Sequence, residues 1–186
     1  MKNILIIGGA RSGKSVFAQE LALKLGKPVL FVATATAGDE EMEQRILEHQ
    51  RVRPATWSTL EATTHIGSQI LREIGSAQVV IVDCITLLIN NIFSQCSHQG
   101  EQVDAPLVEK EVASEINELV ACINQVDACF IMVTNEVGTG LVPTDKVARL
   151  YRDLLGKDNQ MLAEVSAEVY LMVAGLPVRI KPARGV

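Results

Sequence analysis

The chain has 186 residues, of which 48% are hydrophobic and 21% charged, and its formal net charge is -5. This length favours one domain, residues 1–186, with a single core. The negative charge and an aromatic content of 4% argue against nucleic-acid binding. No apolar run is long enough to span a bilayer, and the N-terminal apolar stretch is too short for a signal peptide, so we expect a cytoplasmic protein.

Four short runs rich in Ile and Val are predicted to be buried parallel strands, at residues 3–7, 29–33, 79–83 and 129–134. Apolar residues at helical spacing lie between them and predict amphipathic helices. These residues are Phe17, Leu21 and Leu25, then Ile66, Ile70 and Ile74, then Val108, Val112, Ile116, Leu119 and Ile123. The alternation of strands and helices predicts a doubly wound α/β fold with a mostly parallel sheet.

The last part of the chain predicts one more helix and a hairpin. Pro143 followed by Thr144 or Asp145 is typical of a helix start, and the apolar spacing continues up to Gly156, where we expect the helix to end. The stretch "VYLMVAGLPVRIK" predicts two short strands that turn at Gly175. Residues 94–106 have no periodicity and are predicted to form a mobile loop.

The stretch "GGARSGKS", residues 8–15, matches the phosphate-binding pattern G-x-x-x-x-G-K-[ST] between a predicted strand and a predicted helix. Its backbone N–H groups and the helix N-terminus can surround phosphate oxygens, and Lys14 can reach the β and γ phosphates. Ser15 would hold Mg²⁺, with Asp83 at the end of an apolar strand as the second metal partner. This indicates a nucleotide site but does not separate a kinase from an ATPase or a GTPase.

The stretch "RILEHQRVRP", residues 45–54, places one histidine among three arginines near the end of a predicted helix. His49 falls on the apolar face with Arg45 beside it, so it is either a half-buried core histidine or part of the nucleotide site. Lowering the pKa of His49 would raise its neutral fraction at pH 7 by less than about twofold, whereas stabilising phosphate charge contributes several kcal/mol. We therefore expect the arginines to bind phosphate, beside an imidazole that can attack an α-phosphorus.

Six motifs follow one another along nearly the whole chain. They are "GGARSGKS" at residue 8, "ATATAGDEEMEQRI" before His49, "RPATWSTLEA" from Arg53, "VDCITLLINN" from Val82, "VTNEVGTGLVP" from Val133 and "YRDLLGKDNQMLAEVSAEVYL" from Tyr151. Taken together, they resemble those of the bifunctional adenosylcobinamide kinase / adenosylcobinamide-phosphate guanylyltransferase family of cobalamin biosynthesis. The resemblance implies a RecA-like P-loop NTPase fold.

The resemblance implies two reactions, which are phosphorylation of the aminopropanol hydroxyl of adenosylcobinamide by ATP or GTP and GMP transfer from GTP to that phosphate. It implies His49 as the residue that carries the GMP. His49 and Lys14 of the phosphate-binding loop are thus the candidate catalytic residues, and Ser15 and Asp83 remain the candidate Mg²⁺ ligands. The resemblance also implies a homo-oligomer, specifically a trimer. The implied nucleotide contacts are Gly8, Gly9, Ala10, Arg11, Ser12, Gly13, Lys14, Ser15, Ala33, Thr34, Ala35, Gln50, Arg51, Val52, Arg53, Glu61 and Asp83.

Several alternatives stay open at the level of the sequence. Glu61 is either a guanine partner or an exposed acid after a strand. Asn135 and Glu136 either meet the corrinoid or only order their loop. His65 and His98 match no motif and are candidates for ordinary surface residues. Two functions compete with this one, namely a small-molecule kinase without nucleotidyl transfer and a RecA-like nucleotide switch.

Overall fold

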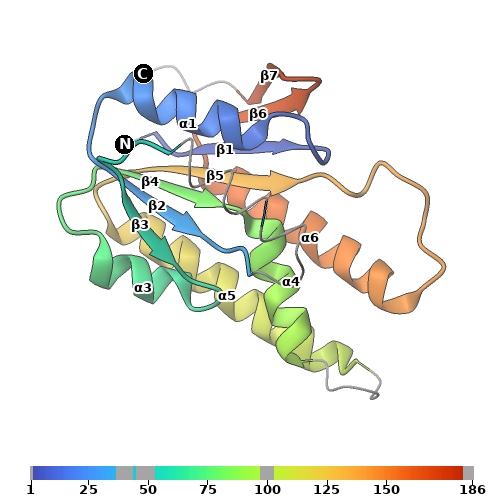
Figure 1. Ribbon diagram of the computed structural model, residues 1–186. Helices are drawn as coiled ribbons and strands as arrows, with labels where there is room; N and C mark the ends of the chain where they lie inside the picture. Colours follow the sequence, from blue (N-terminus) through green and yellow to red (C-terminus); the bar gives the residue numbers. More distant parts are fainter. Residues whose placement is uncertain (1, 37–43, 45–52, 97–102, 182–186) are drawn as a thin grey trace.

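The computed structural model describes residues 2–36, 44, 53–96 and 103–181. Its strands form one sheet in the order β3-β2-β4-β5-β1-β6-β7 (Figure 1). Neighbouring strands are parallel, except that β7 runs antiparallel to β6. The bounds are β1 Ile4–Gly8, β2 Val29–Ala33, β3 Ser58–Glu61, β4 Val79–Asp83, β5 Cys129–Asn135, β6 Glu168–Val173 and β7 Leu176–Lys181. The predicted α/β class and the terminal hairpin are confirmed.

Helices cover both faces of the sheet unequally (Figure 1). Among the helices that the structure describes, α1 packs against one face, through Ala18 and Ala22. The other described helices, α3, α4, α5 and α6, pack against the opposite face, and their buried apolar residues form the larger core. The bounds are α1 Lys14–Leu25, α3 Ile66–Glu73, α4 Ile85–Cys96, α5 Ala105–Gln125 and α6 Lys146–Val165. None of the helices described has an apolar stretch long enough to cross a membrane.

The helix faces expected from apolar spacing are mostly confirmed. All five spaced residues of α5 are buried, and so are Ile66 and Ile70 of α3. In α1, however, the most buried apolar residues are Ala18 and Ala22, while Leu25 is 42% exposed. Small side chains let this helix approach the sheet closely, so its large apolar residues lie at the flank of the contact or outside it.

The prediction of a long loop at residues 94–106 is wrong at both ends. Helix α4 continues to Cys96, and α5 already begins at Ala105. The carboxylate of Asp104 accepts a hydrogen bond from the Leu107 N–H at 3.2 Å, which caps the start of α5. Pro106 fits the first turn because the N–H groups there have no partner within the helix. Residues 97–102 lie outside the described residues.

The prediction that the following helix ends at Gly156 is also wrong. Asp145 caps α6 as expected, by accepting a hydrogen bond from the Ala148 N–H at 2.8 Å. The helix then passes through Gly156 and ends at Val165. Buried residues continue beyond the glycine, at Leu162 among others, so packing outweighs the weak helix propensity of glycine.

Candidate nucleotide-binding site

The loop between β1 and α1 has the shape that its glycines permit. Gly13 has a φ of 95°, in the left-handed region, and its carbonyl accepts the first hydrogen bond of α1 from the Phe17 N–H at 3.0 Å. The Gly175 N–H, in the β6–β7 turn, donates to the Ser12 carbonyl at 3.0 Å. A Cβ atom on Gly8 would lie 2.6 Å from the Met172 carbonyl oxygen. The hairpin therefore supports the loop from outside and leaves no room for a side chain at Gly8.

Lys14 and Ser12 are the polar side chains buried in this loop. The Lys14 ammonium donates to the Gly9 carbonyl at 2.6 Å, so it is folded back over the loop. Burial lowers the pKa of Lys14, and the nearby Cys84 and Asp83 oppose that effect. The Ser12 hydroxyl is buried without a hydrogen-bond partner among the described residues. A buried cation and an unsatisfied hydroxyl in a loop at a helix N-terminus suit a phosphate.

The two predicted acids, Asp83 and Glu61, lie in one row at the carboxyl ends of the two strands that flank β2. Asp83 on β4 and Glu61 on β3 are both in register with Ala33 on β2. Registered residues point to the same face of a sheet, and Ala33 packs in the core beneath α1. Both carboxylates are therefore directed to the face that carries Lys14.

Arg53 lies over the same row. Its guanidinium carbon is 3.7 Å from the centre of the Phe31 ring, and its Nη1 donates to the Thr59 hydroxyl at 3.0 Å. Burial lowers the pKa of Arg53, while the negative charges of Asp83 and Glu61 act against this. The Arg53 Nε atom is buried and has no hydrogen-bond partner in the described part of the chain. The site thus combines two cations, Lys14 and Arg53, with two carboxylates.

Of the predicted contacts at Ala33, Thr34 and Ala35, Thr34 has a structural role that the sequence does not indicate. Its hydroxyl accepts from the Cys84 N–H and donates to the Cys84 carbonyl, both at 2.7 Å. Burial raises the pKa of the Cys84 thiol to about 12, so this thiol is protonated beside Lys14. The Thr34 N–H also donates to the Asp83 carbonyl at 3.2 Å, so Thr34 ties the end of β2 to the end of β4.

Asn91 is a residue of the site region that sequence reasoning missed. It is 7% exposed, and its amide donates to the Thr34 carbonyl at 2.8 Å and to the Thr63 carbonyl at 3.1 Å. Its oxygen accepts from the Thr36 hydroxyl at 3.3 Å. Asn91 therefore joins the segments that follow β2 and β3. An amide in the otherwise apolar run of α4 is the signal that could have identified it.

The predicted histidine nucleophile, His49, lies outside the described residues, together with Arg45, Gln50, Arg51 and Val52. Of that stretch the structure places Arg53, and it places the start of the connecting segment up to Thr36.

The segment after β5 lies beside the phosphate-binding loop. The Glu136 N–H donates to the Gly8 carbonyl at 3.1 Å, and the Glu136 carboxylate accepts from the Gly138 N–H at 2.6 Å. Glu136 therefore orders its own turn, which is one of the two roles that the sequence left open.

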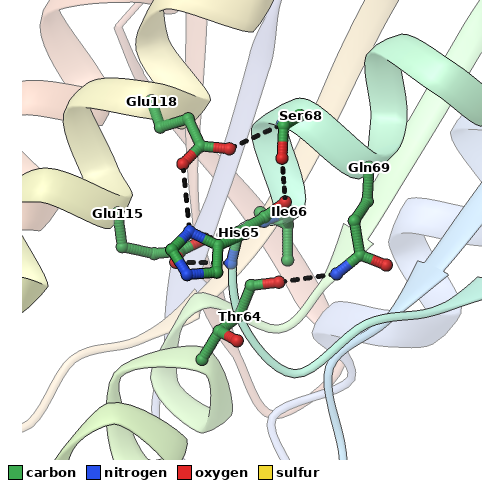
Figure 2. A network of polar contacts seen from close by, with 7 residues as sticks. All are labelled: Thr64, His65, Ile66, Ser68, Gln69, Glu115 and Glu118. Carbon is green, nitrogen blue, oxygen red and sulfur yellow. Dashed lines mark hydrogen bonds and ion pairs between the residues drawn. The ribbon is translucent and has the colours of Figure 1, made fainter.

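His65 belongs to a polar network between α3 and α5, shown in Figure 2. Glu115 of α5 accepts hydrogen bonds from the backbone N–H groups of His65 and Ile66, at 2.6 and 2.8 Å. Glu118 accepts from the Ser68 N–H at 2.6 Å and lies 3.3 Å from the His65 ring. Burial acts to raise the pKa of Glu118, but the hydrogen bonds outweigh it and hold the pKa low.

This network replaces a missing cap. His65 precedes α3 with a φ of 50° and gives it no side-chain cap, so two carboxylates of α5 satisfy the N–H groups of its first turn. The His65 side chain is 73% exposed, in agreement with the expected surface position. His98 lies outside the described residues.

Comparison with known proteins identifies the family. The family described as "Cobinamide kinase / cobinamide phosphate guanyltransferase" matches residues 4–180. The chain belongs to this family. It is 38% identical over 180 residues to the bifunctional adenosylcobalamin biosynthesis protein CobU of Salmonella typhimurium, covering 96% of this chain and 99% of that protein. It is also 38% identical over 180 residues to the protein of that name from Escherichia coli.

A third relative extends the comparison to another organism. The bifunctional adenosylcobalamin biosynthesis protein CobP of Pseudomonas aeruginosa is 38% identical over 177 residues, covering 95% of this chain and 96% of that protein. Matches of this extent agree with the observed P-loop NTPase fold and make the chain an enzyme of the cobinamide kinase / guanyltransferase family.

Proposed function

We propose that this protein phosphorylates adenosylcobinamide with ATP or GTP and then transfers GMP from GTP to the new phosphate through His49. The observation that carries the proposal is the row of Asp83 and Glu61 on one face of the sheet, with Arg53 above it and Lys14 of α1 near Asp83. A nucleotide fits this row with its phosphates at the loop and its base toward β3. Family membership supports the two activities.

In the kinase step the protein mainly positions the reactants and stabilises charge. The hydroxyl oxygen of the corrinoid side chain forms a bond to the γ-phosphorus, and the bond from that phosphorus to the β,γ-bridging oxygen breaks. The nucleoside diphosphate leaves with the electron pair, and the hydroxyl proton is released to solvent. Lys14 leaves the Gly9 carbonyl and donates to the phosphate oxygens instead.

Ser15 and Asp83 are the residues that would hold Mg²⁺. The hydroxyl of Ser15 in the first turn of α1 and the carboxylate of Asp83 at the end of β4 are oxygen ligands, which this cation prefers. No group of three or more His, Cys, Asp or Glu side chains that could hold a metal occurs among the described residues. That fits Mg²⁺, since the remaining ligands would be phosphate oxygens and water. Bound there, the ion would neutralise charge on the transferring phosphate.

In the second reaction a ring nitrogen of His49 attacks the α-phosphorus of GTP, and pyrophosphate leaves. The substrate's phosphate oxygen then attacks the same phosphorus, the bond to His49 breaks, and the product carries a diphosphate link to guanosine. A nucleophile divides one difficult transfer into two easier ones. Arg51 and Arg53 bind phosphate oxygens in this proposal. Glu61 accepts from the N1–H and the amino group of guanine, which makes the second reaction specific for GTP.

We also propose that the chain acts as one domain, residues 1–186, and as a homotrimer in the cytoplasm. Its corrinoid substrate approaches the γ-phosphate end of the nucleotide. Size-exclusion chromatography with light scattering tests the assembly, and a mass of one or two chains would contradict a trimer.

A mass measurement tests the guanylyl transfer. The protein is incubated with Mg²⁺ and GTP, and its intact mass is compared before and after treatment with acid or alkali. We expect one GMP adduct that acid removes and alkali does not. His49→Ala should abolish the adduct. The matched control is His65→Ala, because His65 lies between α3 and α5 and should leave the adduct unchanged.

No adduct on the wild-type protein, or an unchanged adduct on His49→Ala, would contradict the mechanism. Phosphorylation of the corrinoid without any adduct would identify a monofunctional kinase.

A further inference from the structure

We propose that the side-chain amide of Asn135 binds the γ-phosphate during the kinase step. Asn135 is the last residue of β5, the strand between β1 with its phosphate-binding loop and β4 with Asp83. It is in register with Gly8, the first residue of the loop. Its Cα is therefore placed between the two parts of the protein that handle phosphate.

Strand alternation directs the Asn135 side chain to the face that holds Lys14. Val133 packs in the core beneath α1. Thr134 points the opposite way, where its hydroxyl donates to Asn159 of α6 at 2.8 Å. Asn135 follows on the same side as Val133, because successive side chains alternate. Within the described part of the chain no hydrogen bond to the Asn135 side chain is observed, which leaves its amide group available to a ligand.

A buried polar network fixes the backbone of Asn135. Its N–H donates to the Thr86 hydroxyl at 2.8 Å, and its carbonyl accepts from the Asn159 amide at 3.0 Å. The Thr86 carbonyl in turn accepts from the Tyr151 hydroxyl at 2.8 Å. Thr86, Thr134 and Asn159 are all less than 10% exposed. Such a satisfied network makes the end of β5 rigid, as a residue that binds a transition state requires.

The order of the strands indicates which phosphate Asn135 meets. This step rests on the proposed function, in which Glu61 on β3 binds the base. From β3 the sheet continues through β2 and β4 to β5 and then to β1. A nucleotide that enters from β3 therefore has its α-phosphate farthest from β5 and its γ-phosphate nearest. Asn135 should thus donate a hydrogen bond to a γ-oxygen while the bond to the β,γ-bridging oxygen breaks.

The experiment compares the two reactions in Asn135→Ala. Phosphorylation of adenosylcobinamide is measured with ATP, and the rate of GMP adduct formation is measured with GTP. We expect kcat for phosphorylation to fall by about 10²-fold, as when one donor to a transition-state oxygen is removed. KM for ATP and the rate of adduct formation should stay within about threefold, because the α-phosphorus reacts elsewhere.

Two further variants keep the test decisive. Asn135→Asp preserves the size of the side chain but removes the donor, so it should lower kcat at least as much as Asn135→Ala. If Asn135→Ala is not folded, Asn135→Asp decides alone. The matched control is Asn90→Ala on α4, an exposed position outside the network, which should leave both rates unchanged.

Two outcomes would overturn the proposal: a kcat within threefold of wild type in both variants, or an equal loss of phosphorylation and adduct formation. The second outcome would mean that Asn135 only shapes the loop. If the wild-type protein forms no adduct, the proposed guanylyl transfer fails, whereas the change in kcat with ATP still decides the role of Asn135.

Discussion

Asp158 provides a sharp test of the packing of α6. Its side chain is 2% exposed, and its Oδ2 atom has no hydrogen-bond partner among the described residues. Burial raises the pKa of this carboxyl from 3.8 to about 7, and it outweighs the positive charge of Lys157, which acts to lower the pKa. The folded protein therefore binds a proton at Asp158 in a pH range where the unfolded chain has lost it.

The direction in which stability changes with pH follows from the linkage between protonation of Asp158 and folding. Because the folded pKa is the higher one, stability is greatest below about pH 4 and falls as the pH rises to about 7, where the loss is complete. A pKa difference of about 3 corresponds to at most about 4 kcal/mol, of which about 3 kcal/mol is lost between pH 5 and pH 8. Asp158→Asn should abolish this contribution. The variant keeps a buried amide that lacks a partner, which costs about 1–3 kcal/mol at any pH.

Urea unfolding at pH 5 and pH 8 measures the effect. We expect the change in unfolding free energy caused by Asp158→Asn to be more favourable at pH 8 than at pH 5 by about 2–3 kcal/mol. The control is Asp153→Asn in the same helix, whose carboxylate is 65% exposed and pairs with Arg152. It should change stability by less than about 0.5 kcal/mol at either pH. Equal effects of Asp158→Asn at both pH values would show that the buried carboxyl is not protonated in the folded state.

Three more predictions concern other parts of the chain. Lys14→Ala should abolish both phosphorylation and GMP adduct formation, since both use one phosphate cradle; retention of phosphorylation would mean separate sites. Glu115→Gln should lower the unfolding free energy, measured by urea unfolding, by about 2 kcal/mol, because two hydrogen bonds to the start of α3 lose their charged acceptor. The control is Glu109→Gln, at an exposed position of the same helix. Gly156→Ala should raise the unfolding free energy by about 0.5–1 kcal/mol, as an added Cβ meets nothing within 4 Å; destabilisation would point to a contact made by another subunit.

The sequence predicts the parts of the fold that local rules control. The strands β1, β2, β4 and β5 were found because buried parallel strands are continuous runs of Ile and Val. β3 has no such signal, since most of its four residues are exposed at the sheet edge. The sequence does not predict α4, because its buried residues lie on much of its circumference and not along one narrow stripe.

The candidate site also has some parts that the sequence predicts and others that it does not. The phosphate-binding loop and Asp83 can be predicted because their pattern is local and precedes or follows a strand. The supporting contacts cannot, because they depend on the register of distant elements. Asn91 bonds to Thr34, 57 residues away, and Asn159 bonds to Asn135, 24 residues away. Asp158 stands in the polar stretch "GKDNQ", where nothing in the sequence indicates a buried carboxyl.

These supporting contacts give the two faces of the sheet different roles. Charged groups that suit a nucleotide gather on the face beneath α1, namely Lys14, Arg53 and the two acids. Amides and hydroxyls of α4 and α6 hold the same strand ends from the opposite side, through backbone groups of Thr34 and Asn135. In the proposed kinase step a ligand draws Lys14 away from the Gly9 carbonyl, and we expect backbone groups held in this way to keep their positions. On this proposal the side chains of one face rearrange while the strand ends that carry them stay in place.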